Sequence, residues 1–408
     1  MSFKNNNFKK TRFGKIYHGI ITGASGNDPA GITTYSIVGA TTGFTQLFLV
    51  PISTVFLIVV QSICARIGDV KKKGLTAVIK ERFGTKVAFL AILLLVIVNL
   101  TTMGADLSAV SMAFKILFPE LKIFFILPLI SLFIWYIVVF KNYSFISRFL
   151  MILSLIFVSY IFSGFAVKPN WSEVFFNTLW PKIPFDSYYW LIAVGFLGTT
   201  LSPYMFFWQT SEEVEDNPSI RDAKNEIRQN APGLILSSLI AFFIIICTAS
   251  VLFVNKIEIN SATEAALALK PFLGDYAFAL FAVGIIGAGL LVLPVLASCT
   301  AYAIAEIFNW KEGLCKKVHS AKGFYTVLSA TFFIALAISL LDINPIKVLL
   351  YSQILNGFLT PILLILIMII ASSKRIMGKY INTWGLNVLG WLAILTMILA
   401  IVASFTIR

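Results

Sequence analysis

The sequence predicts an all-α protein that crosses a membrane many times, and three observations support this fold class. The chain has 408 residues, of which 58% are hydrophobic and only 12% are charged, and its mean hydropathy is +0.89. A soluble domain carries roughly 25% charged residues, so one core cannot bury this apolar excess. Apolar segments recur along the whole chain, and basic residues gather between them. A helical bundle embedded in a bilayer accounts for all three features.

Eleven segments are apolar and long enough to cross about 30 Å of hydrocarbon, which takes about 20 helical residues. We place them at 16–43, 46–66, 87–114, 123–141, 145–167, 187–212, 232–255, 275–306, 323–342, 346–372 and 386–406. The first, sixth and eighth are long and contain helix-breaking residues. The remaining eight are ordinary spans.

The basic residues predict how these spans are oriented, because cytoplasmic loops are enriched in Lys and Arg. If the N-terminal tail is inside, every cation-rich connection falls on that same side. These connections include Lys71, Lys72, Lys73, Arg82, Arg221, Lys224, Arg228, Lys311, Lys316, Lys317, Lys374 and Arg375. We therefore expect a plasma-membrane protein with a cytoplasmic tail over 1–15 and its C-terminus outside. That tail has no apolar core, so it does not resemble a cleaved signal.

Several function classes are disfavoured by what the sequence lacks. The four cysteines form no CxxC pair, so neither a structural zinc site nor a disulfide framework is supported. No P-loop, nucleotide fingerprint or nucleophile motif is found, which argues against an ATP-driven pump, an enzyme or a bound cofactor. The net charge of +13 is explained by topology, so we expect no nucleic-acid partner.

Two spans carry an unusual interruption at mid-membrane. The first contains Gly23-Ala-Ser-Gly-Asn-Asp-Pro-Ala-Gly31, and the sixth contains Gly195-Phe-Leu-Gly-Thr-Thr-Leu-Ser-Pro203. Proline removes an amide donor, and freed carbonyls at membrane depth are tolerated where they line a cavity. Five spans separate the two breaks, so a second five-helix unit would be inverted. Such paired breaks indicate the solute site of a transporter, with repeats over 16–167 and 187–372.

Asp28 is the most informative residue in the first break. An ionisable group at membrane depth costs a few kcal/mol, so it should face an aqueous cavity and serve a function. It precedes Pro29, which makes it equally suited to cap the second half of the helix, and the two roles are compatible. Asn27 offers a neutral oxygen or acts as a turn residue.

The second break is surrounded by hydroxyl groups. Thr199, Thr200, Ser202 and Tyr204 lie close to Pro203. Each Ser or Thr alone usually bonds back to its own helix carbonyls, but a cluster beside a break favours a role in solute binding. Tyr204 is either a hydrogen-bond donor or an aromatic wall.

Other polar residues lie in the third, sixth and tenth spans. Asp106 is the second deep acid, and we expect it to serve a proton or co-ion path unless it is a structural carboxylate. Gln353 and Asn356 share one helix face, where they could complete a coordination shell or bond one helix to another. The acidic run after span 6 is expected to be a solvated helix end; it comprises Glu212, Glu213, Glu215 and Asp216.

Together these motifs resemble the Nramp family of divalent metal transporters. Asp28-Pro29-Ala30-Gly31 resembles the family's Asp-Pro-Gly-Asn motif, and Ser202-Pro203-Tyr204 sits where the family has Met-Pro-His. Gly104-Ala105-Asp106-Leu107 and Ser352-Gln353 follow in the family's order. The resemblance covers essentially all eleven spans. It implies the LeuT-type fold, with two inverted five-helix repeats and an eleventh helix, and a metal site at the unwound parts of spans 1 and 6.

The resemblance also implies a ligand set. The family's aspartate ligand falls on Asp28 and its asparagine ligand on Gly31, which has no side chain. The carbonyl donor of span 6 falls on Thr199, and the methionine ligand falls on Ser202. A thioether favours transition metals, so replacing it with a hydroxyl makes the site harder. We therefore expect a hydrated hard ion such as Mg²⁺ or Mn²⁺ as the substrate.

The family's proton pathway is only partly retained. Its two histidines fall on Tyr204 and Gln209, its pathway aspartate on Asp106, and its nearby glutamate on Ala109. These losses weaken the case for proton coupling, and the sequence does not decide whether protons are a co-substrate.

Two other readings remain. A LeuT-type protein could carry an amino acid or an organic cation, although Asp28 would repel a carboxylate. A protein of this fold could also act as a sensor that transports nothing, for which an appended signalling domain would argue.

Overall fold

The computed structural model describes residues 27–120, 122–140, 155–216, 226–341 and 343–407. All regular structure in these residues is helical, and no strand occurs among them. Eight helical segments within this part of the chain are long and apolar enough to span a bilayer, and two shorter apolar helices accompany them. The predicted all-α membrane bundle is therefore confirmed.

The helices of the bundle follow the predicted spans closely. They are α3 (Pro29–Thr42), α4 (Leu49–Lys71), α6 (Thr85–Leu117), α7 (Ile123–Phe140), α9 (Ser159–Ala166), α11 (Ser187–Thr200), α12 (Pro203–Asp216), α13 (Glu226–Thr248), α16 (Tyr276–Ile307), α17 (Lys322–Ser339), α18 (Pro345–Ala371) and α20 (Trp384–Thr406). The expected first and fifth spans begin outside the described residues. The breaker Pro294 does not interrupt the eighth span, because α16 runs through it as one helix.

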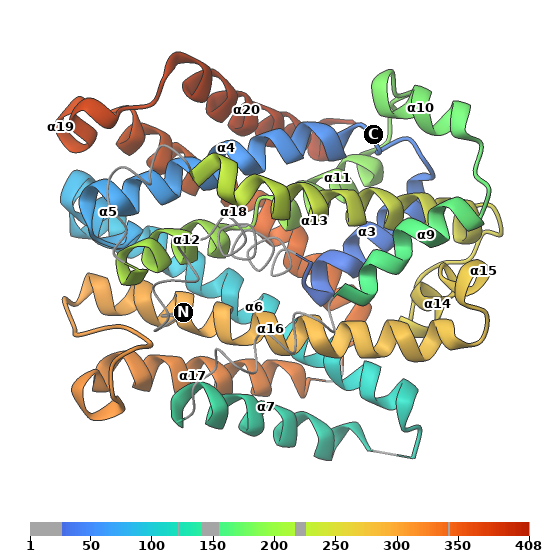
Figure 1. The fold of residues 1–408 in the computed structure, drawn as a ribbon, viewed down its shortest axis with the longest axis horizontal. Helices are drawn as coiled ribbons and strands as arrows, with labels where there is room; N and C mark the ends of the chain where they lie inside the picture. Colours follow the sequence, from blue (N-terminus) through green and yellow to red (C-terminus); the bar gives the residue numbers. More distant parts are fainter. Residues whose placement is uncertain (1–26, 121, 141–154, 217–225, 342, 408) are drawn as a thin grey trace.

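Five short helices occupy the connections, where the hydropathy pattern predicted none. They are α5 (Leu75–Phe83), α10 (Trp171–Leu179), α14 (Ala262–Leu267), α15 (Lys270–Leu273) and α19 (Lys374–Met377). In Figure 1, α5 and α19 lie at one end of the molecule, while α10, α14 and α15 lie at the other with the C-terminus. The long helices run between these ends.

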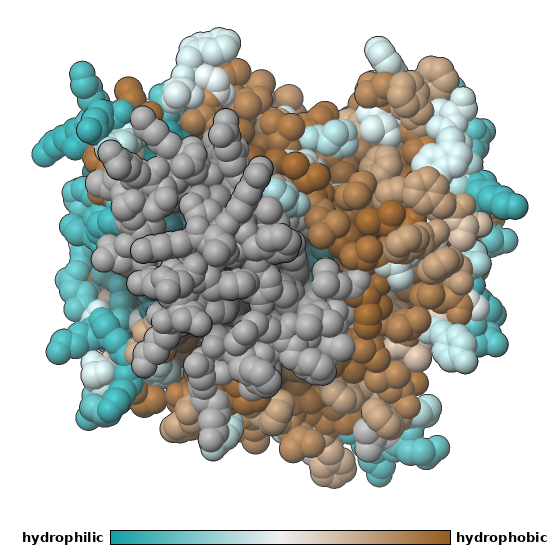
Figure 2. Space-filling view, viewed as in Figure 1, coloured by the Kyte–Doolittle hydropathy of each residue, from teal (hydrophilic) through white to brown (hydrophobic). Residues whose placement is uncertain are grey.

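The surface has the polarity that a bilayer requires. Figure 2 shows a hydrophobic band across the middle of the visible face, with hydrophilic residues at both ends. The exposed large apolar side chains of the membrane helices include Phe125, Leu129, Phe133, Phe162, Leu395 and Leu399. Lipid tails would cover such a band, because a soluble monomer rarely exposes so large a contiguous apolar patch.

Helix α3 lies in the interior of the bundle, where it packs against α11, α13, α18 and α6. The break between α11 and α12 lies close to it. Small residues permit this close packing: a Cβ on Gly198 of α11 would lie 2.3 Å from the backbone nitrogen of Gly357 in α18. The two interrupted segments therefore meet in the centre of the molecule.

Candidate cation-binding site

The first part of the site is the N-terminus of α3. Asp28 is the N-cap residue, and its Oδ1 accepts a hydrogen bond from the Gly31 amide at 2.5 Å. Pro29 occupies the first helical position, where its missing amide costs nothing and its fixed φ suits a helix. The capping role predicted for Asp28 is confirmed. The carboxyl group is only 3% exposed, so it lies in the interior of the bundle.

A second carboxyl group reaches the same helix terminus from α6. Asp106 is fully buried, and its Oδ1 accepts a hydrogen bond from the Ala30 amide at 3.0 Å. Asp28 and Asp106 therefore cap consecutive amides of α3, where the helix dipole favours negative charge. Helices α3, α11 and α12 contain no Lys, Arg or His to neutralise the pair. Within the described chain, the buried Oδ2 of Asp106 has no hydrogen-bond partner.

The second part of the site is the break between α11 and α12. Pro203 has no amide, so the carbonyl of Thr199 four residues earlier loses its helical partner. The Ser202 hydroxyl lies 2.9 Å from that carbonyl and 3.0 Å from the Gly198 carbonyl, and it donates to them. Ser202 thus satisfies backbone groups that the break leaves free.

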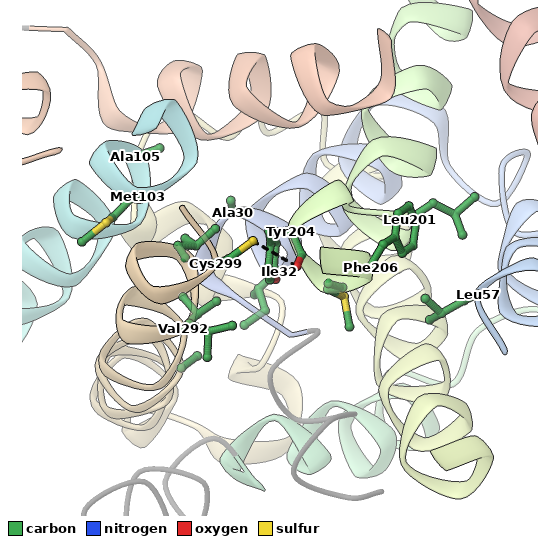
Figure 3. Packing of buried hydrophobic residues seen from close by; sticks show 14 of the residues in the cluster. Ala30, Ile32, Leu57, Met103, Ala105, Leu201, Tyr204, Phe206, Val292 and Cys299 are labelled. Carbon is green, nitrogen blue, oxygen red and sulfur yellow. Dashed lines mark hydrogen bonds between the residues drawn. The ribbon is translucent and has the colours of Figure 1, made fainter. Parts of the chain in front are cut away.

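Tyr204 joins the two breaks. Its hydroxyl donates to Asp28 Oδ2 at 3.3 Å, which confirms the donor reading over a purely aromatic wall. Figure 3 shows Tyr204 beside Ala30 and Ile32 of α3, with the Cys299 thiol of α16 donating to the Tyr204 carbonyl. The start of α12 is therefore held against both α3 and α16.

Gly31 and Thr199 face each other across the site. A Cβ placed on Gly31 would lie 2.8 Å from Asp28 Oδ1 and 3.0 Å from Thr199 Oγ1. Thr199 is 3% exposed, and its hydroxyl has no hydrogen-bond partner among the described residues. A Cβ at position 31 would be too close to Asp28, so glycine lets both oxygens approach the backbone of α3 closely.

The remaining predicted residues are engaged elsewhere. The Gln353 amide contacts Ser352 and Asn356, and Asn356 also donates to Thr102 of α6 at 3.2 Å. Among the contacts of the described residues, none joins the Gln353 side chain to Asp28. The shared helix face predicted for Gln353 and Asn356 is confirmed.

The side chains of Asn27 and Gln209 make hydrogen bonds to residues other than Asp28 and Asp106. Asn27 Oδ1 accepts a hydrogen bond from Ser237 of α13 at 2.9 Å. Gln209 donates to Glu213 one turn later in α12 at 2.8 Å. Their roles in solute binding and in an ion path stay predictions.

The acidic run at the end of α12 is not the solvated helix end that the sequence suggested. Glu212 is only 7% exposed, and Glu215 accepts hydrogen bonds from the Tyr302 hydroxyl and the Leu314 amide. The expectation was wrong for these two residues because α16 and the segment after it pack over α12. The Asp216 side chain lies outside the described residues.

Sequence reasoning missed Glu306, a buried acid at the end of α16. Its Oε2 accepts a hydrogen bond from the Ala77 amide of α5 at 3.0 Å, and Ser211 of α12 lies 3.5 Å from its Oε1. Glu306 therefore links three helices at one end of the bundle. Its position at the end of an apolar span resembles an ordinary helix terminus, so the sequence gives no signal for this role.

The ligand chemistry of the site is oxygen-based. No group of three or more His, Cys, Asp or Glu side chains gathers in a metal-binding arrangement within the described residues. The available atoms are carboxylate and hydroxyl oxygens, which suit Mg²⁺, Ca²⁺ and Mn²⁺ better than soft metals.

Sequence comparison places the chain in a family. The sequence profile described as natural resistance-associated macrophage protein-like, or Nramp, matches residues 19–406. The chain belongs to the Nramp family. The divalent metal cation transporter MntH of Clostridium acetobutylicum is 27% identical over 248 residues, which cover 59% of this chain and 55% of that relative. MntH of Verminephrobacter eiseniae is 23% identical over 382 residues, covering 90% of this chain and 83% of that relative.

Structural comparison agrees with this assignment at the level of the fold. A crystal structure of the Eremococcus coleocola manganese transporter superposes with a TM-score of 0.77 at 17% identity, covering 98% of this chain and 87% of that one. MhsT in complex with L-phenylalanine superposes with a TM-score of 0.63 at 15% identity, covering 97% and 99%. The Nramp chain therefore has the LeuT-type fold predicted from its two broken spans.

Proposed function

We propose that this Nramp protein carries a hard divalent cation, Mg²⁺ or Mn²⁺, into the cell across the plasma membrane by alternating access. It is a transporter and not an enzyme. The names of its relatives support a divalent metal as the substrate class. Asp28 provides charge, and Thr199 and Ser202 provide neutral oxygens. Asn27 and Gln353 would complete the shell by exchanging their present hydrogen bonds with Ser237 and Asn356 for the ion.

One observation carries this proposal. The first amides of α3 are occupied by the protein's own carboxyl groups, since Ala30 donates to Asp106 and Gly31 donates to Asp28. An amino-acid carrier of this fold uses such half-helix amides to bind the substrate carboxylate. Here an incoming carboxylate would find neither a free amide nor a positive side chain on α3, α11 or α12. A cation would find two acids that have no basic partner on those helices.

The proposal is tested by ion flux into proteoliposomes that contain the purified protein. Mn²⁺ and Mg²⁺ are offered separately, with Asp28→Ala beside the wild type and a pH dye inside the vesicles. Asp186→Ala is the matched control. Asp186 is also an N-cap residue, since it accepts a hydrogen bond from the Tyr189 amide at 2.9 Å, but it caps the opposite end of α11 from the break.

We expect uptake of at least one of the two ions by the wild type and by Asp186→Ala, and its loss in Asp28→Ala. Acidification that accompanies uptake would add protons as a co-substrate through Asp106; an unchanged dye signal would establish uncoupled transport. Absence of flux for both ions would contradict the proposal and favour an organic cation or a sensor.

A further inference from the structure

Thr199 is one of several buried hydroxyl residues in the membrane helices that have no hydrogen-bond partner among the described residues; Ser163 and Ser298 are others. A buried Ser or Thr in a helix normally donates to a carbonyl three or four residues earlier. Most such residues here do so, namely Thr34, Ser36, Thr200, Thr248, Thr300, Thr331 and Thr360. Thr199 makes no such bond, although it is adjacent to Thr200 in the same turn of α11. Its hydroxyl is therefore directed away from its own helix.

A buried hydroxyl without a partner destabilises a protein by about 1–3 kcal/mol. Such a group usually marks a place where a ligand or an ordered water belongs. The Thr199 hydroxyl is 3.0 Å from the point where a Gly31 Cβ would stand, and that point is 2.8 Å from Asp28 Oδ1. The unpartnered oxygen and the carboxylate that is expected to hold the cation therefore both lie close to Gly31, on the side of α3 where its side chain would project.

The Thr199 carbonyl, unlike the hydroxyl of the same residue, has a hydrogen-bond partner among the described residues. The Ser202 hydroxyl donates to it at 2.9 Å, so this carbonyl already has a hydrogen-bond partner inside the protein. The backbone oxygen that the family resemblance implies as a donor is therefore partly satisfied, while the side-chain oxygen of the same residue is not.

We propose that the Thr199 hydroxyl oxygen is a direct ligand of the transported cation and takes the coordination position that Gly31 leaves without a side chain. This inference rests on the proposed function and names the atom that serves it. A neutral hydroxyl in that position keeps the site oxygen-based, which favours hard ions. Gly31 is then required as glycine, because any Cβ would fill the space between Thr199 and Asp28.

Thr199→Val tests the proposal, because valine keeps the shape and the carbonyl of threonine and replaces the hydroxyl with a methyl group, which cannot bind a cation. Thr199→Ser restores the hydroxyl. Thr200→Val is the matched control: its hydroxyl bonds to the Phe196 carbonyl at 3.0 Å and lies 3.2 Å from the Tyr35 hydroxyl. Two quantities are measured on purified protein in detergent, the Kd for Mn²⁺ and Mg²⁺ by titration calorimetry and the Tm of the metal-free protein.

We expect Thr199→Val to raise the Kd by roughly tenfold or more, the loss that follows when a buried oxygen ligand is removed. Its metal-free Tm should stay the same or rise, because the deleted hydroxyl has no partner. Thr200→Val should show the opposite pattern, with an unchanged Kd and a lower Tm. Thr199→Ser should bind like the wild type.

Gly31→Ala is a second variant that removes no oxygen. Its Cβ enters the space between the two oxygens, so it should weaken metal binding as Thr199→Val does. An unchanged Kd in both Thr199→Val and Gly31→Ala, with normal binding by the wild type, would overturn the inference and leave the proposed function standing. A wild-type protein that binds neither ion would overturn both.

Discussion

Asp28 combines two physical roles in one side chain. It satisfies an amide at the start of α3, and it places a carboxylate beside the break in the second interrupted segment. An Asn side chain can also cap a helix, but it carries no charge. The two roles can therefore be separated by substitution.

We expect Asp28→Asn to keep the stability of the wild type while losing divalent-cation binding. Asp28→Ala should lose both binding and about 0.5–2 kcal/mol of stability, the usual cost of removing an N-cap. Thermal unfolding and metal titration of the two variants measure these effects side by side. Equal binding by Asp28→Asn and the wild type would show that the charge of this residue is not needed.

Single residues were predictable where the sequence carried a local signal. Asp28 before Pro29 identifies a cap, and Pro203 identifies a break, because each feature depends on nearby backbone chemistry. The contact between Asp106 and the Ala30 amide spans 76 positions in the chain. It depends on how α6 packs against α3, and no local pattern encodes that packing. The hydrogen bond from Asn356 to Thr102 of α6, which spans 254 positions, was not predictable for the same reason.

At the scale of elements, one end of the bundle is held together by acidic side chains. Glu306 of α16 caps the start of α5 and lies near Ser211 of α12, while Glu215 of α12 bonds to Tyr302 of α16. A helix that moves during alternating access would have to break these contacts. These contacts therefore tie α5, α12 and α16 together at this end of the bundle.

We expect Glu306→Ala to loosen α5. Removing a buried charge-assisted hydrogen bond costs about 1.5–3 kcal/mol, so backbone amides over 74–83 should exchange roughly tenfold faster or more. Hydrogen–deuterium exchange followed by mass spectrometry measures this. Glu81→Ala is the control within α5, because its ion pairs with Lys71 and Lys73 are on the surface and contribute little. Unchanged exchange in Glu306→Ala would exclude the capping role.

Glu312, in the segment between α16 and α17, gives a pH prediction. Burial, followed by the negative charge of Glu306, raises the pKa of Glu312 from 4.5 to about 8, although Lys316 opposes the shift. Between these two values the unfolded chain binds fewer protons than the folded one at this group. Its contribution to stability is therefore present below pH 4.5 and is lost as the pH rises toward 8.

Glu312→Gln removes this titration. The variant should unfold at a higher Tm than the wild type at pH 8 and at nearly the same Tm at pH 5, as measured by thermal scans in one buffer series. A Tm difference that is the same at both pH values would exclude the predicted titration.

At the scale of the whole molecule, basic residues gather at one of the two ends of the bundle. The end that carries α5 and α19 also carries Lys71, Lys72, Lys73, Arg82, Lys374 and Arg375, so the positive-inside rule predicts that this end faces the cytoplasm. The fold class and the order of spans were predictable because hydropathy reports burial in lipid directly. The short helices in the connections were not, because they are too short and too polar to leave a hydropathy signal.

Cysteine labelling tests this orientation. Cys315 is exposed in the segment after α16, whereas Cys64, Cys247 and Cys299 are buried. A membrane-impermeant maleimide should leave Cys315 unlabelled in intact cells and should label it in inside-out vesicles. Lys182→Cys, before α11 at the opposite end, should show the reverse pattern. Labelling of Cys315 in intact cells would reverse the assigned orientation.

The Ser202 hydroxyl has a consequence for the transport cycle. Because it donates to carbonyls that the break leaves without helical partners, the interruption between α11 and α12 has hydrogen bonds of its own in the absence of an ion. Little backbone ordering is then required when the ion arrives, and little is lost when it leaves. A carrier built in this way can return empty, so net uptake need not be limited to one-for-one exchange across the membrane.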